Sequence, residues 1–193
     1  MRKISFVVMF VAAVALAVGP ALAQEGKAPA KAPTPAGTQS QEILMMWNAV
    51  GKKLVDMAED FPEDKYDYKL QKDQRTFAEN LLHVAAANYL LLSAVKGSPM
   101  GPGGGEDFPR SEYKTKADVV KILKQAVADG AALIKEQGDA GLSKETKFPF
   151  GNMMVRASFD WMEAIEHMGE HYGQLVGYYR ANNMVPPASR RGM

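Results

Sequence analysis

The segment EHMGEHYGQLVGYYR, residues 166–180, contains two of the three histidines of this 193-residue chain. His167 and His171 are four residues apart, and on a helix such side chains lie on one face, one turn above each other. Their imidazoles can then bind a single ion, and this residue type suits zinc or nickel. Alternatively, both are solvated side chains of a surface helix. The third histidine, His83, lies much earlier in the chain.

The histidines flank the apolar stripes of the helices expected to carry them. The stripe beside His167 and His171 is centred on Trp161, Ile165, Met168, Tyr172 and Leu175. His83 lies near Ala86 and Ala87, whose small side chains leave room for a ligand. A lone helical histidine is more often a packing or solvated residue. If the three imidazoles meet, we expect them in a groove between two helices, with a coordination position left open for water or substrate.

Two known metal-enzyme motifs do not fit this chain. Residues 167–171 match the H-x-x-E-H motif of inverted zinc proteases, but that motif needs a carboxylate ligand well downstream, and no Asp or Glu follows His171. Di-iron bundles need a Glu three residues before each histidine. The residues at those positions here are Asn80, Ala164 and Met168. Both classes of metal site are therefore excluded.

Composition excludes several further classes. The chain has no cysteine, which rules out disulfides, thiolate zinc sites, iron–sulfur clusters, covalent c-type haem and cysteine nucleophiles. Its formal net charge is +1, so it lacks the basic surface of a nucleic-acid-binding protein. An apolar core must supply the stability, and a domain of this length can bury one.

The first 23 residues have the pattern of a secretory signal peptide. Arg2 and Lys3 precede an apolar run over residues 4–18, and the small residues Ala21 and Ala23 mark a cleavage site. The run is shorter than the about 20 residues that a membrane span needs, although an uncleaved anchor is the alternative. We therefore predict an exported protein, periplasmic or extracellular, with no membrane span after cleavage.

One domain follows a short linker. Residues 24–39, rich in Ala, Pro and Lys, are too polar to build a core and predict a flexible linker. We expect the domain to span residues 40–189, with residues 190–193 as a solvated tail. Apolar residues recur at helical spacing in four segments, and no segment shows a strand pattern. The four segments are residues 40–60, 76–96, 116–138 and 152–182.

Local signals support these helices. Ser40 is the expected N-cap of the first helix, and Thr76 with Glu79 forms a capping box for the second. Four amphipathic helices without strands predict an all-α fold, a four-helix bundle. The segment between the second and third helices is expected to be a long loop rich in glycine.

Three longer blocks carry a family resemblance. They are AEDFPEDKYDYKL (58–70), RTFAENLLHVAAAN (75–88) and HMGEHYGQLVGYYRANNMVPPAS (167–189). Together they resemble the DinB superfamily of four-helix-bundle metalloenzymes, over about residues 43–189. The resemblance implies a bundle of the DinB type and a divalent metal, most often nickel or zinc, held by His83, His167 and His171. Some relatives are transferases or isomerases that use mainly cytoplasmic thiols, such as bacillithiol or mycothiol, so predicted export departs from the family pattern.

We therefore expect a metal-dependent hydrolase or transferase acting on a small-molecule substrate of unknown identity. Glu170 and Glu163 are candidate catalytic residues, because either carboxylate can accept a proton or orient a ligand imidazole. Each can equally be a solvated carboxylate on a helix face.

Two non-enzymatic alternatives remain open. The histidines can serve a protein that carries or buffers a metal, or an interaction module can present Tyr178, Tyr179 and residues 97–109 to a partner. The many methionines suit soft metals, although methionine more often fills gaps in a helical core. Related bundles often pair as homodimers, and no feature of this sequence specifies an interface.

Overall fold

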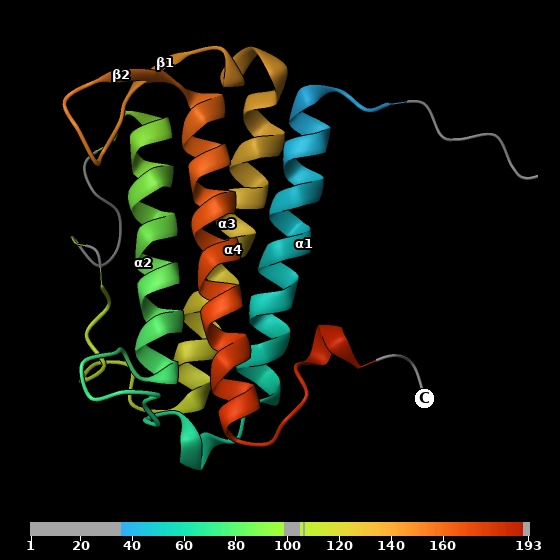
Figure 1. Ribbon diagram of the computed structural model, residues 1–193. Helices are drawn as coiled ribbons and strands as arrows, with labels where there is room; N and C mark the ends of the chain where they lie inside the picture. Colours follow the sequence, from blue (N-terminus) through green and yellow to red (C-terminus); the bar gives the residue numbers. More distant parts are fainter. Residues whose placement is uncertain (1–35, 99–104, 106, 191–193) are drawn as a thin grey trace, which may run out of the picture. The chain divides into compact units, whose positions relative to one another are not determined.

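Four long helices dominate the computed structural model, which describes residues 36–98, 105 and 107–190 (Figure 1). They are α1 (Gln39–Asp60), α2 (Phe77–Lys96), α3 (Lys116–Leu142) and α4 (Ala157–Ala181), with short 3-10 helices at Glu63–Lys65 and Pro187–Ser189. The predicted all-α four-helix bundle is confirmed. The predicted signal peptide and most of the predicted linker lie outside the described residues. In the described part of the chain, no helix is both long and apolar enough to cross a membrane.

Capping boxes begin three of the four described long helices. The side chains of Thr38, Thr76 and Thr115 each accept a hydrogen bond from the backbone N–H three residues later. The side chain of that later residue accepts a hydrogen bond from the backbone N–H of the threonine. The predicted box at Thr76 is confirmed. The predicted N-cap Ser40 is wrong, because Thr38 has Gln41 three residues later to complete a box, whereas Ser40 is followed at that distance by Ile43.

The helices do not simply alternate in direction. α1 and α4 run one way through the bundle, and α2 and α3 run the other way (Figure 1). α1 packs against α3 and α4, and α2 packs against the same two helices. Consequently α2 and α4 share a long antiparallel seam. Because α2 and α3 are parallel, the connection between them must return along the length of the bundle.

Two short strands were missed by the sequence prediction. β1 (Glu145–Lys147) and β2 (Met154–Arg156) pair antiparallel, with Thr146 opposite Val155. Three residues are too few to display a period-2 pattern. The second strand occupies the predicted first turn of the last helix, so α4 begins at Ala157 rather than at residue 152. Asp160 is fully buried and accepts a hydrogen bond from the Thr146 hydroxyl, which ties α4 to the strands.

The helical geometry of α3 is interrupted at Gly138, near the predicted end of the third helix. Gly138 has φ 54° and ψ −165°, a backbone conformation that glycine adopts at little cost. A further short helical stretch then runs to Leu142. Arg190, placed in the predicted tail, is exposed, and its Nη1 lies 2.8 Å from Oδ1 of Asp60.

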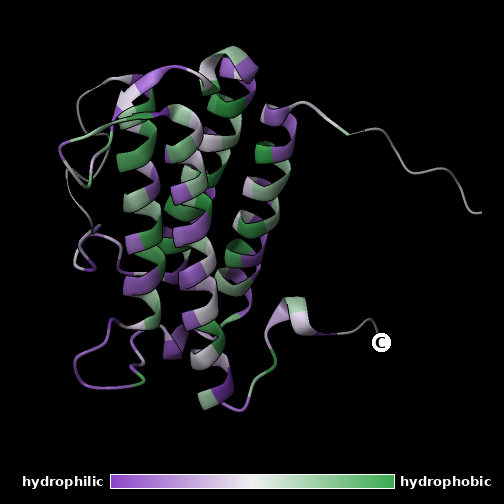
Figure 2. Cartoon of the chain, turned by 45° about the horizontal axis from the view of Figure 1, so that its top comes forward, coloured by the Kyte–Doolittle hydropathy of each residue, from purple (hydrophilic) through white to green (hydrophobic). Residues whose placement is uncertain are grey.

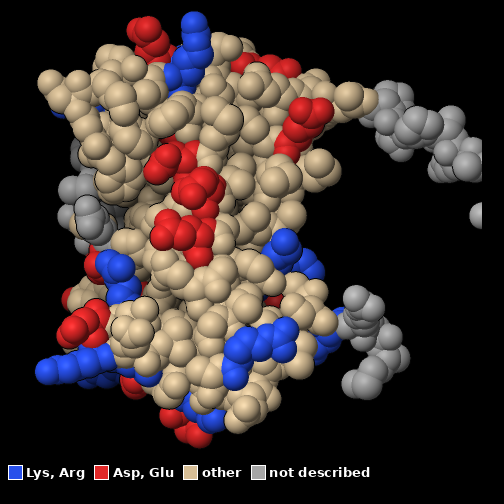
Figure 3. All heavy atoms as spheres, viewed as in Figure 1, with Lys and Arg blue, Asp and Glu red and all other residues tan. Residues whose placement is uncertain are grey.

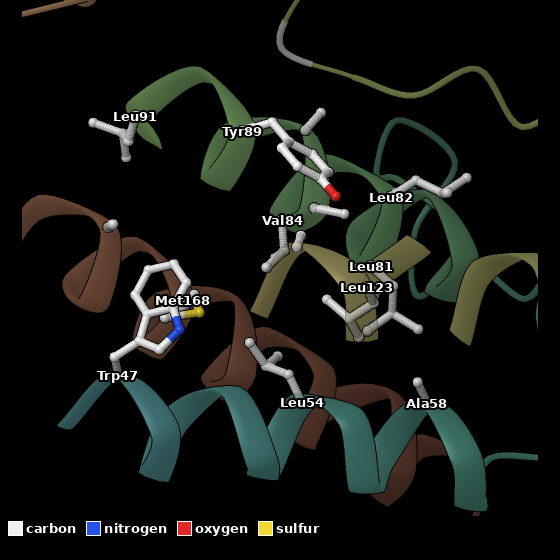
Figure 4. Close-up of a cluster of buried hydrophobic side chains, with 14 of the residues drawn as sticks. Trp47, Leu54, Ala58, Leu81, Leu82, Val84, Tyr89, Leu91, Leu123 and Met168 are labelled. Carbon is white, nitrogen blue, oxygen red and sulfur yellow. The ribbon is translucent and has the colours of Figure 1, made fainter. Parts of the chain in front are cut away.

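The core lies between the four helices, where the hydrophobic faces meet (Figure 2). Trp47 and Trp161 are fully buried and meet edge to face with ring centroids 5.4 Å apart. Figure 4 shows Trp47 and Leu54 of α1 beside Met168 of α4, with the labelled α2 residues above them. The contact between Trp47 and Trp161 therefore packs α1 directly against α4.

The predicted partner surface at Tyr178 and Tyr179 is wrong. The two tyrosines are 2% and 0% exposed. Their hydroxyl groups bond inside the bundle, that of Tyr179 donating to the Met57 carbonyl at 3.0 Å. Aromatic residues in the last turns of α4 therefore stabilise the bundle and are not available to a partner.

Candidate metal centre

The α2–α4 seam brings the three predicted histidines together. His83 comes from α2, and His167 and His171 come from α4. One ring nitrogen from each can be chosen so that all three lie within 4.8 Å of one another. Nε2 of His83 and Nε2 of His167 are 3.1 Å apart. The predicted convergence is confirmed, and the role of these residues as metal ligands stays a prediction.

Burial keeps two of these imidazoles neutral. Removal from water, with a smaller effect of the neighbouring imidazoles, lowers the pKa of His167 to about 4 and that of His171 to about 3. His171, which lies on the flank of the apolar stripe of α4 as expected, is only 5% exposed. α2 covers that flank when the seam closes. At neutral pH both rings therefore keep a nitrogen lone pair that can bind a cation.

Asn80 orients His171 from the facing helix. Its amide nitrogen donates to the Thr76 carbonyl at 3.0 Å and to the Tyr178 hydroxyl at 3.2 Å. The amide oxygen therefore faces Nδ1 of His171, 3.2 Å away, and accepts a hydrogen bond from its N–H group. The Nε2 lone pair of His171 is then available. In the sequence, Asn80 served only to exclude a di-iron site, although its place three residues before His83 puts it on the same helix face.

Asp107 holds His83 from outside the helices. Its Oδ1 lies 2.9 Å from Nδ1 of His83, and its Oδ2 lies 3.2 Å from Nη2 of Arg75. The carboxylate accepts a hydrogen bond from the Nδ1–H group of His83. The Nε2 lone pair of His83 then faces His167. Sequence reasoning missed this residue, because it belongs to the α2–α3 connection and no spacing rule relates it to the histidines.

The donor set fits a divalent cation. Two nitrogens bound to one tetrahedral zinc ion, at Zn–N distances of about 2.0–2.1 Å, are roughly 3.3 Å apart, close to the 3.1 Å between the two Nε2 atoms. A proton on one of the two nitrogens can join them by an N–H···N hydrogen bond, and a cation can instead bind both lone pairs. Nδ1 of His167 is buried and has no hydrogen-bond partner among the described residues. Neutral imidazoles are also the ligands that zinc and nickel prefer.

The two predicted catalytic glutamates lie on α4 beside the triad. Glu170 is exposed and accepts a hydrogen bond from Gln174 at 3.1 Å, and Glu163 is half-buried. Within the described part of the chain, neither carboxylate hydrogen-bonds to a triad histidine. Figure 3 shows a group of acidic side chains in the middle of this face of the bundle, over α4. The catalytic role of Glu163 and Glu170 stays a prediction.

Sequence comparison identifies the family. A sequence model of the DinB superfamily matches residues 46–175, more than half of the chain. The chain belongs to the DinB superfamily. The matched range contains all three histidines and Asp107, so the site lies inside the DinB domain. Comparison with curated proteins finds no match.

Two solved DinB-like structures from Bacillus subtilis share the fold. YjoA, a DinB-like protein, is 20% identical with a TM-score of 0.61, and the match covers 78% of this chain and 99% of YjoA. YfiT is 12% identical with a TM-score of 0.61, and the match covers 79% of this chain and 93% of YfiT. YfiT is described as a probable metal-dependent hydrolase with an unusual four-helix bundle topology. At these identities the likeness shows the DinB fold alone.

Proposed function

We propose that this chain is an exported metal-dependent hydrolase or transferase, with zinc or nickel held by His83, His167 and His171. The observation that carries the proposal is the convergence of three imidazole nitrogens within 4.8 Å. The description of the fold relative YfiT as a probable metal-dependent hydrolase supports the same reading. The signal-peptide pattern of residues 1–23 supports export.

Each part of the site has a distinct task in this proposal. A zinc or nickel ion supplies Lewis acidity and lowers the pKa of a water or thiol ligand. The neutral imidazoles bind the ion, while Asn80 and Asp107 set which ring nitrogen of His171 and His83 faces it. The buried seam limits access of water to the ligand nitrogens. We assign proton transfer to Glu170 or Glu163, at the exposed side of α4.

The direct test is the metal content of the mature chain, residues 24–193, purified without a histidine tag. We expect about one divalent ion per chain by elemental mass spectrometry, lost in the His83→Ala variant and in the His167→Ala/His171→Ala variant. Circular dichroism checks that each variant is folded. Equal metal in all three proteins, or no metal after incubation with zinc and nickel, contradicts the proposal.

A second function, as a non-enzymatic metal carrier, is favoured by one observation. Neither candidate glutamate contacts the triad through a hydrogen bond in the described part of the chain, so no proton acceptor on α4 is held against it. A carrier shows reversible metal exchange and no turnover of any substrate.

The Glu170→Gln variant separates the two functions, with Glu166→Gln as a matched control on the same exposed face of α4. For an enzyme, Glu170→Gln keeps the metal but loses about 10²–10⁴-fold in rate, the usual contribution of general acid–base catalysis. The control keeps both. The assay uses a panel of ester, amide and phosphate-ester substrates with the metal-loaded protein. Turnover that is equal in all three proteins refutes the role of Glu170.

A further inference from the structure

The histidines differ in what holds the ring nitrogen that points away from the triad. Nδ1 of His171 faces Asn80, a buried residue of α2. Nδ1 of His167 has no hydrogen-bond partner among the described residues. Nδ1 of His83 contacts Asp107, which belongs to the α2–α3 connection. One edge of the centre therefore depends on a segment that is not part of the helical frame.

Asp107 is held in place from two sides. Arg75, the residue before the N-cap of α2, contacts the carboxylate oxygen that does not face His83. Phe108, the next residue, is 4% exposed and packs against the rings of Tyr89 and Tyr113, with centroids 6.1 and 5.2 Å away. Phe108 thus anchors the backbone of the connection while the Asp107 side chain, 49% exposed, turns toward His83.

Packing does not explain the place of this carboxylate. An exposed ion pair with Arg75 contributes little to stability, and Asp107 fills no part of the core. Its contact with His83 does have a chemical consequence. A carboxylate that accepts a hydrogen bond from the Nδ1–H group of a ligand histidine fixes the tautomer and the orientation of the ring. It also raises the basicity of the other ring nitrogen. That other nitrogen of His83 faces His167 at 3.1 Å.

We infer that Asp107 is a positioning residue of the metal centre, through which metal binding depends on the α2–α3 connection as well as on the helices. The inference rests on the proposed metal-binding function. Asp107 acts through His83 and touches no substrate. The connection that the parallel course of α2 and α3 requires thereby completes the site.

The test compares zinc affinity in the mature parent and three variants, by competition with a chromophoric chelator. Asp107→Ala is expected to bind zinc about 10- to 100-fold more weakly, the usual loss for such an outer partner. Asp107→Glu retains a carboxylate and is expected to recover part of the affinity. The matched control is Asp67→Ala, because Asp67 is also an exposed loop aspartate and its carboxylate pairs with Arg110 at 2.9 Å. The control is expected to bind like the parent.

A second measurement needs no metal. Nitrogen-15 NMR of the metal-free protein at a pH at which the rings are neutral reports which nitrogen of His83 carries the proton. We expect an Nδ1–H tautomer in the parent and in Asp67→Ala, and its loss in Asp107→Ala. Unchanged zinc affinity in Asp107→Ala, an equal loss in Asp67→Ala, or an unchanged tautomer overturns the inference. A parent that binds neither zinc nor nickel overturns the proposed function instead, and the tautomer of His83 then still decides whether Asp107 positions that ring.

Discussion

The imidazoles of His167 and His171 leave water when α4 packs against α2, and their pKa values fall to about 4 and about 3. Residue type alone does not do this, because a solvated histidine titrates near 6.5. The consequence for binding is that protons compete weakly with a cation for the lone pairs of these two imidazoles at neutral pH. The consequence for folding is that the folded state loses stability as the pH falls, because its buried imidazoles stay neutral.

The folding cost gives a pH prediction for the metal-free protein. Between pH 6.5 and 3 the unfolded chain binds a proton at His171 and the folded chain does not, so stability rises with pH across this window and is lost as the pH falls. We expect the parent to lose on the order of 2 kcal/mol more than His171→Gln between pH 7 and pH 5. Urea unfolding in the presence of a chelator measures both. Carboxylates common to both proteins cancel, and parallel pH profiles contradict the prediction.

Contacts between whole helices depend on glycines at close approaches. Gly130 of α3 faces Trp47 of α1, and a Cβ at position 130 would lie 2.1 Å from Cζ2 of the indole. Trp47 is fully buried and its Nε1 donates to the Val127 carbonyl at 2.8 Å, so the ring has no room to move. This contact sets how closely α1 and α3 pack.

We therefore predict opposite effects for two glycine-to-alanine changes. Gly130→Ala forces the indole or the helices apart and destabilises the fold by about 1–3 kcal/mol. Gly173→Ala, on the exposed face of α4 with nothing within 4 Å of the added Cβ, stabilises it by up to about 1 kcal/mol through helix propensity. Chemical denaturation reports both values. A Gly130→Ala protein as stable as the parent would show that the α1–α3 spacing is not limited by Trp47.

The molecule as a whole combines a bundle with parallel α2 and α3 and a predicted export signal. Asp107, in the connection between the parallel helices α2 and α3, meets His83 at the candidate metal centre. The proposed export would place that site outside the cytoplasm.

Export has its own test in a secreting bacterial host. We expect the intact mass of the exported protein to correspond to a chain that begins at Gln24. The Ala21→Phe/Ala23→Phe variant is expected to retain residues 1–23, because signal peptidase needs small side chains at the cleavage site. Cell fractionation shows where each form accumulates. A full-length parent found only in the cytoplasm would refute both the signal peptide and the proposed location.

Much of the fold was predictable, because helix formation follows local rules. Apolar spacing and the Thr76–Glu79 box located α2 to within a residue, since both act between residues a few positions apart. The short strands were missed for the opposite reason. Their pairing of Thr146 with Val155 joins residues whose runs are too brief to carry a pattern, and it decides where α4 begins.

The sequence by itself determined the four helices and the place of His167 and His171 on one helix face, because helical spacing alone aligns residues four apart. It did not determine what lies opposite that face. Only the tertiary structure decided that His171 is buried, that Asn80 faces it, and that Asp107 reaches His83 from the connection. These contacts join residues that are distant in the chain. They form only when α2 packs against α4 and the α2–α3 connection brings Asp107 to His83.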